Sequence, residues 1–135
     1  MSKESDTEFV RRFFEVVWNA NNTEAAKALV HDNYISIENF VFASTPGPQI
    51  VAAEMQLYRS LYDGLNFKIE RVFSEGNTVV TVWQASGTSK TETFVNRKGD
   101  PQAKTLEVEG VSLTEVKDGK IAAHRFLWPR RRLSP

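Results

Sequence analysis

The stretch Thr105–Trp128, TLEVEGVSLTEVKDGKIAAHRFLW, decides how this chain folds. Two runs of alternating side chains flank Lys117-Asp118-Gly119, and this pattern predicts a β-hairpin. The turn can close in two ways. A two-residue turn at Asp118 and Gly119 would place His124 across from Leu113. A three-residue loop with a left-handed glycine would place His124 across from Ser112 instead.

The three-residue closure is preferred because it gathers one coherent apolar face. A change of one residue in the pairing exchanges the two faces of a strand. The preferred face is roomy at Gly110 and sparsely polar, as expected of a ligand pocket, and comprises Val108, Gly110, Ser112, Thr114, Ala122, His124, Phe126 and Trp128. The opposite face mixes apolar residues with Glu107, Glu109, Glu115 and Arg125, which suits a partly solvated or subunit-covered surface.

Length and charge limit the classes of protein to consider. The 135 residues predict one domain, spanning 1–135. Lysine plus arginine and aspartate plus glutamate are 17 each, so no global field attracts nucleic acid or an anionic membrane. The sequence has no cysteine, its first residues are polar, and no apolar run is long enough to cross a bilayer. We therefore expect a soluble, cytoplasmic protein with no nucleic-acid or membrane partner.

Helical periodicity dominates the first half of the chain. Ser5 and Glu8 have the spacing of a capping box, and apolar residues then recur from Phe9 to Trp18. Thr23 is expected to cap a short second helix, and a third helix is expected over Gln49–Tyr62 after the prolines. Between them, the alternating segment Tyr34–Glu38 predicts a short strand.

The second half of the chain changes to the period of strands. Segments Leu65–Phe73, Thr78–Ser86 and Ser89–Val95 precede the hairpin and predict consecutive strands. The expected architecture is α+β, with a cone-shaped, curved antiparallel (mixed) sheet wrapped around the N-terminal helices. Its single internal pocket would be lined by the hairpin's apolar face together with Phe14, Trp18, Tyr58 and Trp83.

Four segments carry a resemblance to a known family: VRRFFEVVWNANNTEAAKALVHDNY, GPQIVAAEMQLYRSLY, FSEGNTVVTVWQASGT and LTEVKDGKIAAHRF. Together they resemble the SnoaL-like, or polyketide cyclase-like, branch of the nuclear transport factor 2-like superfamily over nearly the whole chain. The resemblance implies a cone-shaped barrel with an open pocket, commonly in a homodimer. Members of the superfamily include polyketide cyclases, ketosteroid isomerase, epoxide hydrolases and proteins without known catalysis.

The resemblance also carries over individual residues. Glu38 corresponds to the base of ketosteroid isomerase, but Phe14 and Ser112 stand where that enzyme has its oxyanion donors, so ketosteroid isomerisation is not expected. The acid of SnoaL-like cyclases would fall near Pro129, where no carboxylate occurs. Tyr58 matches a pocket tyrosine, and the apolar lining positions are matched by Trp83, Phe126 and Trp128.

Each candidate site residue has a catalytic and a structural interpretation. His124 suits a general acid or base because its ordinary pKa is near neutrality; alternatively it is a core histidine bonded to Ser112 or Thr114. Glu38 is a base at the cavity mouth or a surface carboxylate. The tyrosines Tyr34 and Tyr58 are donors to a substrate carbonyl or core rings, and the tryptophans Trp18, Trp83 and Trp128 stack on a planar ligand or fill the core.

The functional hypothesis is a cofactor-independent cyclase- or isomerase-type enzyme that binds a small hydrophobic molecule, polycyclic or polyketide-like. Two distant histidines without cysteine give no metal-binding set, and no phosphate loop or nucleophile elbow occurs. Cyclisation, isomerisation and hydration remain open. One alternative is a non-catalytic ligand-binding or dimerisation module whose cavity is filled by its own side chains. Another is a protein-interaction subunit that uses the outer face of the sheet.

Overall fold

The protein is described by a computed structural model over residues 4–36 and 47–129. In chain order, its elements are α1 (Asp6–Arg12), the π-helix η1 (Phe13–Asn19), α2 (Thr23–Leu29), β1 (Val30–Ser36), α3 (Pro48–Leu61), β2 (Tyr62–Glu75), β3 (Thr78–Val95), β4 (Pro101–Lys117) and β5 (Lys120–Leu127). The strands form one sheet in the order β1-β5-β4-β3-β2. The β1–β5 pair is parallel and the others are antiparallel.

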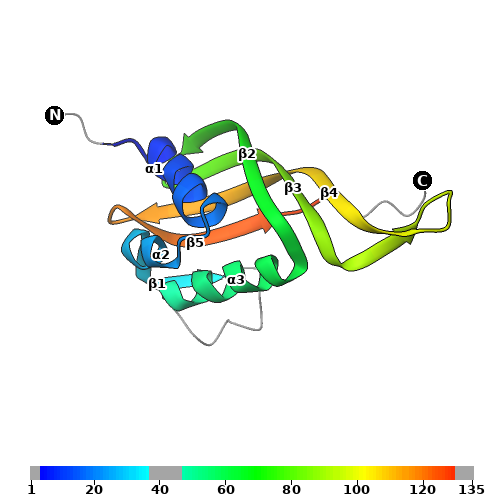
Figure 1. Cartoon of the computed structure of the whole chain (residues 1–135). Coiled ribbons are helices and arrows are strands. Elements are labelled where there is room, and N and C mark those ends of the chain that lie inside the picture. Colours follow the sequence, from blue (N-terminus) through cyan, green and yellow to red (C-terminus); the bar gives the residue numbers. More distant parts are fainter. Residues whose placement is uncertain (1–3, 37–46, 130–135) are drawn as a thin grey trace.

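The curved sheet holds the helices on its concave side (Figure 1). This confirms the predicted α+β class and the mixed sheet around the N-terminal helices. The sheet is not closed into a barrel, because β1 and β2 form its two edges. Within the described ranges, the longest helix is too short and too polar to cross a bilayer.

The first helix forms as its sequence predicts. The amide of Glu8 donates to Ser5 Oγ over 3.2 Å, and the Glu8 carboxylate accepts from the Ser5 amide over 3.3 Å. This capping box satisfies two of the amides that a helix start leaves unpaired. The helix then widens into η1, whose inner side buries Phe13, Phe14, Val17 and Trp18 against the sheet.

Two predicted boundaries in the helical half were wrong. The N-cap of α2 is Asn22 instead of Thr23: Asn22 is extended, and its Oδ1 accepts from the Ala25 amide over 3.0 Å. Asparagine is among the best N-cap residues, so it displaces the threonine that follows it. The short strand begins earlier than predicted, at Val30, and Glu38 lies outside the described residues.

The predicted break before Ser89 does not occur. One long strand, β3, runs through Gly87 to Val95. A Cβ added at Gly87 would lie 3.2 Å from the Asp63 carbonyl oxygen of β2. This glycine therefore allows a close approach between two strand backbones and does not mark a turn.

The three-residue closure of the last hairpin was wrong. Lys117 pairs with Lys120 around a two-residue turn, in which Asp118 and Gly119 have φ values of 54° and 73°. Two successive positive φ angles define the type I′ turn, whose twist matches that of the flanking strands.

A β-bulge beside Val116 then shifts the register, so that His124 pairs with Thr114 and Phe126 with Ser112. His124 therefore lies opposite neither Ser112 nor Leu113. The bulge places Ser112, Thr114, His124 and Phe126 all in the interior, as predicted, although the turn on which the prediction rested is different.

Candidate functional site

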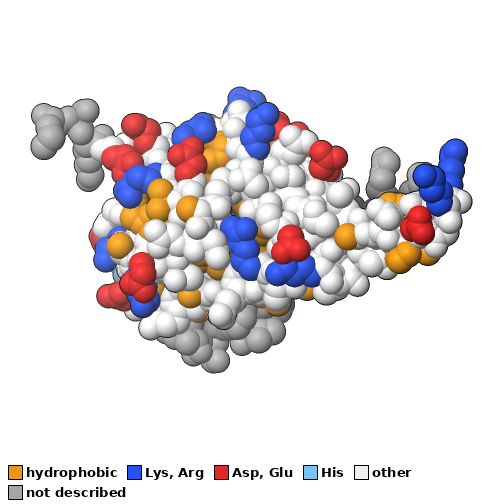
Figure 2. Space-filling view, viewed as in Figure 1, with side chains coloured by type: hydrophobic (Ala, Val, Ile, Leu, Met, Phe, Trp, Pro, Cys, Tyr) orange, Lys and Arg blue, Asp and Glu red, His pale blue; other side chains and the backbone are white. Residues whose placement is uncertain are grey.

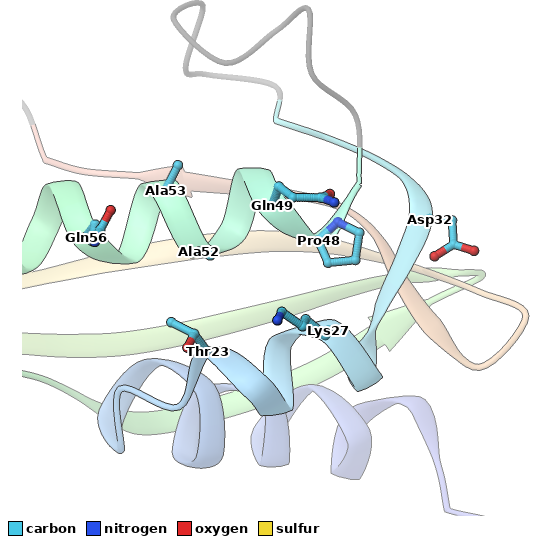
Figure 3. Close-up of a pocket in the computed structure, with 8 residues that line it drawn as sticks. All are labelled: Thr23, Lys27, Asp32, Pro48, Gln49, Ala52, Ala53 and Gln56. Atoms are coloured by element: carbon cyan, nitrogen blue, oxygen red, sulfur yellow. The ribbon is translucent and has the colours of Figure 1, made fainter.

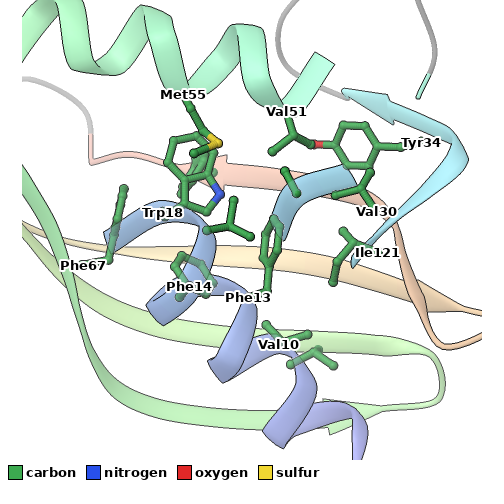
Figure 4. Packing of buried hydrophobic residues seen from close by; sticks show 14 of the residues in the cluster. Val10, Phe13, Phe14, Trp18, Val30, Tyr34, Val51, Met55, Phe67 and Ile121 are labelled. Carbon is green, nitrogen blue, oxygen red and sulfur yellow. The ribbon is translucent and has the colours of Figure 1, made fainter. Parts of the chain in front are cut away.

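Aromatic rings fill the concave side of the sheet, and Phe126 contacts most of them. Figure 4 shows part of this buried cluster, including Phe14, Trp18 and Phe67. The Phe126 ring centroid is 5.0 Å from Trp18, 5.7 Å from Tyr58 and 6.0 Å from Trp83. The Phe67 ring stacks on Phe126 at 5.3 Å. Edge-to-face and offset contacts at these separations are favourable beyond the area they bury.

The interior expected as an open pocket is largely occupied by these side chains. Phe14, Trp18 and Trp83 are all buried. The space at Gly110, predicted to be roomy, is taken by the Trp83 indole: a Cβ at Gly110 would lie 2.3 Å from Trp83 Cη2. Trp83 Nε1 donates to Ser112 Oγ over 2.8 Å, which fixes the indole over the glycine.

His124 lies at the closed end of this interior and is only 3% exposed. Its Nδ1 is 2.8 Å from Thr114 Oγ1, and its ring contacts Phe13, Phe14 and Phe126. Burial among these rings lowers the pKa of His124 to about 3, so the imidazole is neutral at physiological pH. Its Nε2 has no hydrogen-bond partner among the described residues.

An opening lies at the other end of the cluster, beyond Phe126. A hollow of about 270 Å³ is lined by Tyr58, Leu61, Tyr62, Leu106 and Trp128, and we call it the mouth. Tyr58 and Trp128 are half-buried, and Trp128 Nε1 donates to the Tyr58 hydroxyl over 3.1 Å. The mouth thus presents two large aromatic side chains held together by a hydrogen bond.

The sequence analysis did not single out two polar residues beside the interior, Glu54 and Arg59. Glu54 is 4% exposed, and its Oε1 accepts from the Tyr34 hydroxyl over 3.3 Å. The sequence could have indicated this burial, because Glu54 is a carboxylate on the same side of the helix as the apolar residues Ile50, Val51 and Met55. Arg59 donates to the backbone carbonyls of Trp18 and Leu65, and its burial lowers the pKa of the guanidinium. This arginine ties α3 to η1 and β2.

A second hollow lies outside the sheet interior, between α2 and α3 (Figure 3). Its volume is about 620 Å³, and it is lined by Thr23, Lys27, Asp32, Pro48, Gln49, Ala52, Ala53 and Gln56. None of the residues predicted from the sequence lines it. Over the described residues, no three histidine, cysteine, aspartate or glutamate side chains gather as a metal-binding group.

The structure brings together most of the predicted pocket residues, but not all. Six of the predicted lining residues contact one another in the aromatic cluster: Phe14, Trp18, Tyr58, Trp83, Phe126 and Trp128. Ser112 is bonded to Trp83 and faces inward. Tyr34 instead pairs with Glu54 and packs near Val51 (Figure 4).

Comparison with known proteins identifies the family. A model of the SnoaL-like domain matches residues 10–124, so the chain belongs to the SnoaL-like family. No curated protein matches the sequence.

Solved structures share the fold at low identity. A candidate polyketide cyclase from Acidithiobacillus ferrooxidans is 19% identical over 96% of this chain and 92% of its own, with a TM-score of 0.74. TsrD from Streptomyces laurentii is 17% identical over 93% of this chain and 89% of its own, with a TM-score of 0.70. An LEH-like epoxide hydrolase from M. tuberculosis is 18% identical over 92% of this chain and 82% of its own, with a TM-score of 0.66.

Proposed function

We propose that this protein binds a small, planar, hydrophobic molecule at the mouth. The observation that carries the proposal is the contrast in exposure along one aromatic cluster. Trp18, Trp83 and Phe126 are buried, whereas Tyr58 and Trp128 line a hollow and stay half-exposed. Concave apolar sites with a few oriented polar groups are the usual form of ligand pockets.

The two rings at the mouth are held in position before a ligand arrives. The hydrogen bond from Trp128 to Tyr58 fixes the indole, and the Trp83 ring supports it from behind at 4.9 Å. A rigid aromatic surface loses little conformational freedom on binding, which favours stacking of a flat ligand over a flexible chain.

The experiment is a titration with 1,8-dihydroxyanthraquinone, followed by quenching of tryptophan fluorescence. We expect saturable binding by the wild-type protein and at least a tenfold weaker Kd for Trp128→Ala. Leu57→Ala is the matched control, because Leu57 is an exposed apolar residue of α3 that does not line the mouth. Equal affinity for the three proteins would rule out the mouth as the binding site.

A second candidate function is catalysis of the cyclase or isomerase type on a polycyclic or polyketide-like substrate. The names of the cyclase and epoxide hydrolase relatives favour it, as does a neutral imidazole in the same interior. His124 or Glu38 would transfer the proton, with no cofactor required. Cyclisation, isomerisation and hydration all remain compatible with such chemistry.

The test of catalysis replaces the two candidates separately, as His124→Gln and Glu38→Gln. Turnover of a bound candidate substrate should fall at least 100-fold in one of them. Unchanged turnover in both would leave the non-catalytic, ligand-binding alternative. In either case we propose a single cytoplasmic domain over residues 1–135 that forms a homodimer, as the family resemblance implies.

A further inference from the structure

The hollow between α2 and α3 has no part in the function proposed above, and we call it the α2–α3 hollow (Figure 3). Its volume of about 620 Å³ is more than twice that of the mouth and lies in the range of small-molecule sites. Residues three or four apart lie on the same side of a helix, so each helix turns one wall to the hollow. The walls are Thr23 and Lys27 on α2, and Gln49, Ala52, Ala53 and Gln56 on α3.

The two ends of the α2–α3 hollow differ in charge. Figure 3 shows Thr23 and Gln56, both neutral, at one end, and Lys27, Gln49 and Asp32 toward the other. The two glutamines are two turns apart on α3, which separates the ends by about 10 Å. The alanines between them have small side chains, so a ligand can lie close to the helix.

Backbone contacts hold the charged end of the hollow in place. The Gly47 amide donates to the Tyr34 carbonyl over 2.9 Å, which ties the start of α3 to β1. A Cβ added at Gly47, whose φ is 105°, would lie 3.0 Å from the Asp32 carbonyl oxygen and 2.9 Å from Gln49 Oε1. Glycine therefore permits the close approach that brings Asp32 beside the first turn of α3. The backbone that carries these side chains is positioned before a ligand binds.

Lys27 and Asp32 supply one positive and one negative group. Lys27 Nζ lies 3.2 Å from Glu24 Oε1, but these side chains are 65% and 80% exposed, so the pair contributes little and Lys27 can turn to a ligand. Asp32 forms no ion pair with any residue that the structure describes. A simple anion at this end would meet Asp32, and a simple cation would meet Lys27. A ligand that carries both charges can pair with both residues.

The surface as a whole does not select a ligand by its charge. The formal net charge is zero, and basic and acidic side chains are intermingled over the face of the protein shown in Figure 2. No long-range field of one sign therefore steers an anion or a cation to this face. Recognition at the α2–α3 hollow then depends on pairing at short range.

We propose that the α2–α3 hollow binds a small zwitterion of the amino-acid type, with its carboxylate on Lys27 and its ammonium group on Asp32. Gln49 and Gln56 carry side-chain amides that both donate and accept, so they can pair with an amide group of the ligand. A free amino acid with an amide side chain and a dipeptide share this chemistry, and a dipeptide reaches about 7 Å along the hollow. The site is separate from the mouth and does not depend on the ligand proposed there.

Calorimetric titration with L-glutamine and with glycyl-L-glutamine tests the proposal. We expect saturable binding of at least one of them with a Kd below about 1 mM, because two charge-assisted hydrogen bonds and the amide contacts are available. The tighter of the two identifies the free amino acid or the dipeptide as the ligand type. Its N-acetylated form keeps the carboxylate but loses the positive charge, and should bind at least tenfold more weakly. Saturation by neither compound, or equal binding of the acetylated form, would overturn the proposal.

Variants of the two charged residues locate the binding. Lys27→Gln and Asp32→Asn should each weaken the Kd at least tenfold. Lys98→Gln and Asp100→Asn are the matched controls, because they make the same changes at residues 96–100, between β3 and β4, and do not line the hollow. All four side chains are exposed, so the variants should keep the wild-type melting temperature. Wild-type affinity in both hollow variants would overturn the assignment.

A third variant blocks the hollow without a change of charge. Ala53→Leu places a larger side chain between the two ends and should also weaken zwitterion binding at least tenfold. The same variant should bind 1,8-dihydroxyanthraquinone as the wild type does, because Ala53 does not line the mouth. Failure of the α2–α3 site and failure of the mouth are therefore distinguishable. Unchanged zwitterion binding by Ala53→Leu would contradict the proposed position of the ligand.

Discussion

The two ends of the aromatic cluster differ in what covers them. At the closed end, η1 places Phe13 and Phe14 over His124, and Thr114 of the sheet forms a hydrogen bond with the imidazole Nδ1. At the mouth, none of the described residues that line the hollow belongs to α1 or η1, although the Tyr58 ring contacts Trp18 of η1 at 5.6 Å. The residue types are similar, so coverage by the N-terminal helix decides which end is core and which end is accessible.

Phe126 separates the two ends. Its ring lies 4.4 Å from His124 on one side and 5.8 Å from Trp128 on the other. A ligand at the mouth therefore meets Phe126 before it reaches the histidine. For this reason the geometry favours binding at the mouth more strongly than proton transfer at His124.

Removal of the separating ring should have the largest effect. Phe126→Ala leaves a cavity in a closely packed cluster, and such changes cost about 3–5 kcal/mol. Trp128→Ala should cost less, because that indole is already half-exposed. Urea unfolding of the two variants measures the comparison. Equal losses of unfolding free energy in the two variants would contradict the distinction between the filled interior of the cluster and the open mouth.

The sequence predicted which residues belong to the aromatic cluster better than it predicted how their side chains pack. The period of two along β4 and β5 is visible in the sequence, and it assigns Ser112, Phe126 and Trp128 to one face. The bulge that corrects for the tight Asp118-Gly119 turn leaves no comparable local signal, because it depends on which side chains the interior accepts. Likewise, no pattern in the sequence indicates that Trp83 fills the space at Gly110, since their pairing joins residues far apart in the chain.

Acid should also lower the stability of the protein, through His124 at the closed end of the cluster. The unfolded chain binds a proton at His124 near pH 6.5, whereas burial lowers the pKa in the folded protein to about 3. Between these values the unfolded state holds the additional proton, so stability falls as the pH falls. The slope from this one group approaches about 1.4 kcal/mol per pH unit below pH 6.

The measurement is the free energy of unfolding of the wild-type protein and of His124→Gln from pH 7 to pH 4.5. Both proteins keep the same carboxylates and His31, so the difference between their curves isolates His124. The advantage of the wild type should shrink with acid. A constant difference over this range would show that the imidazole is not excluded from water as the structure indicates.

A smaller loss of stability is expected when Gly110, which lies behind the mouth, is replaced. The Cβ of Gly110→Ala would collide with the Trp83 indole, which Ser112 holds in place. Overpacking of this kind costs about 1–3 kcal/mol. Gly87→Ala is the comparison with a smaller clash, since its Cβ would lie 3.2 Å from the Asp63 carbonyl oxygen. Thermal unfolding should rank Gly110→Ala below Gly87→Ala, and the reverse order would mean that the indole yields easily.

The smallest change in stability concerns the polar contact at the mouth. Tyr58→Phe keeps the ring but removes the oxygen that accepts from Trp128 Nε1, at a cost of about 0.5–1.5 kcal/mol for a partly exposed bond. Its effect on binding should be larger in proportion, because the indole loses its fixed orientation and must be ordered when the ligand stacks. Anthraquinone titration should therefore show weaker affinity while urea unfolding changes little. If affinity were unchanged, the Trp128 orientation would be set by Trp83 packing alone, and the hydrogen bond would contribute nothing to the mouth.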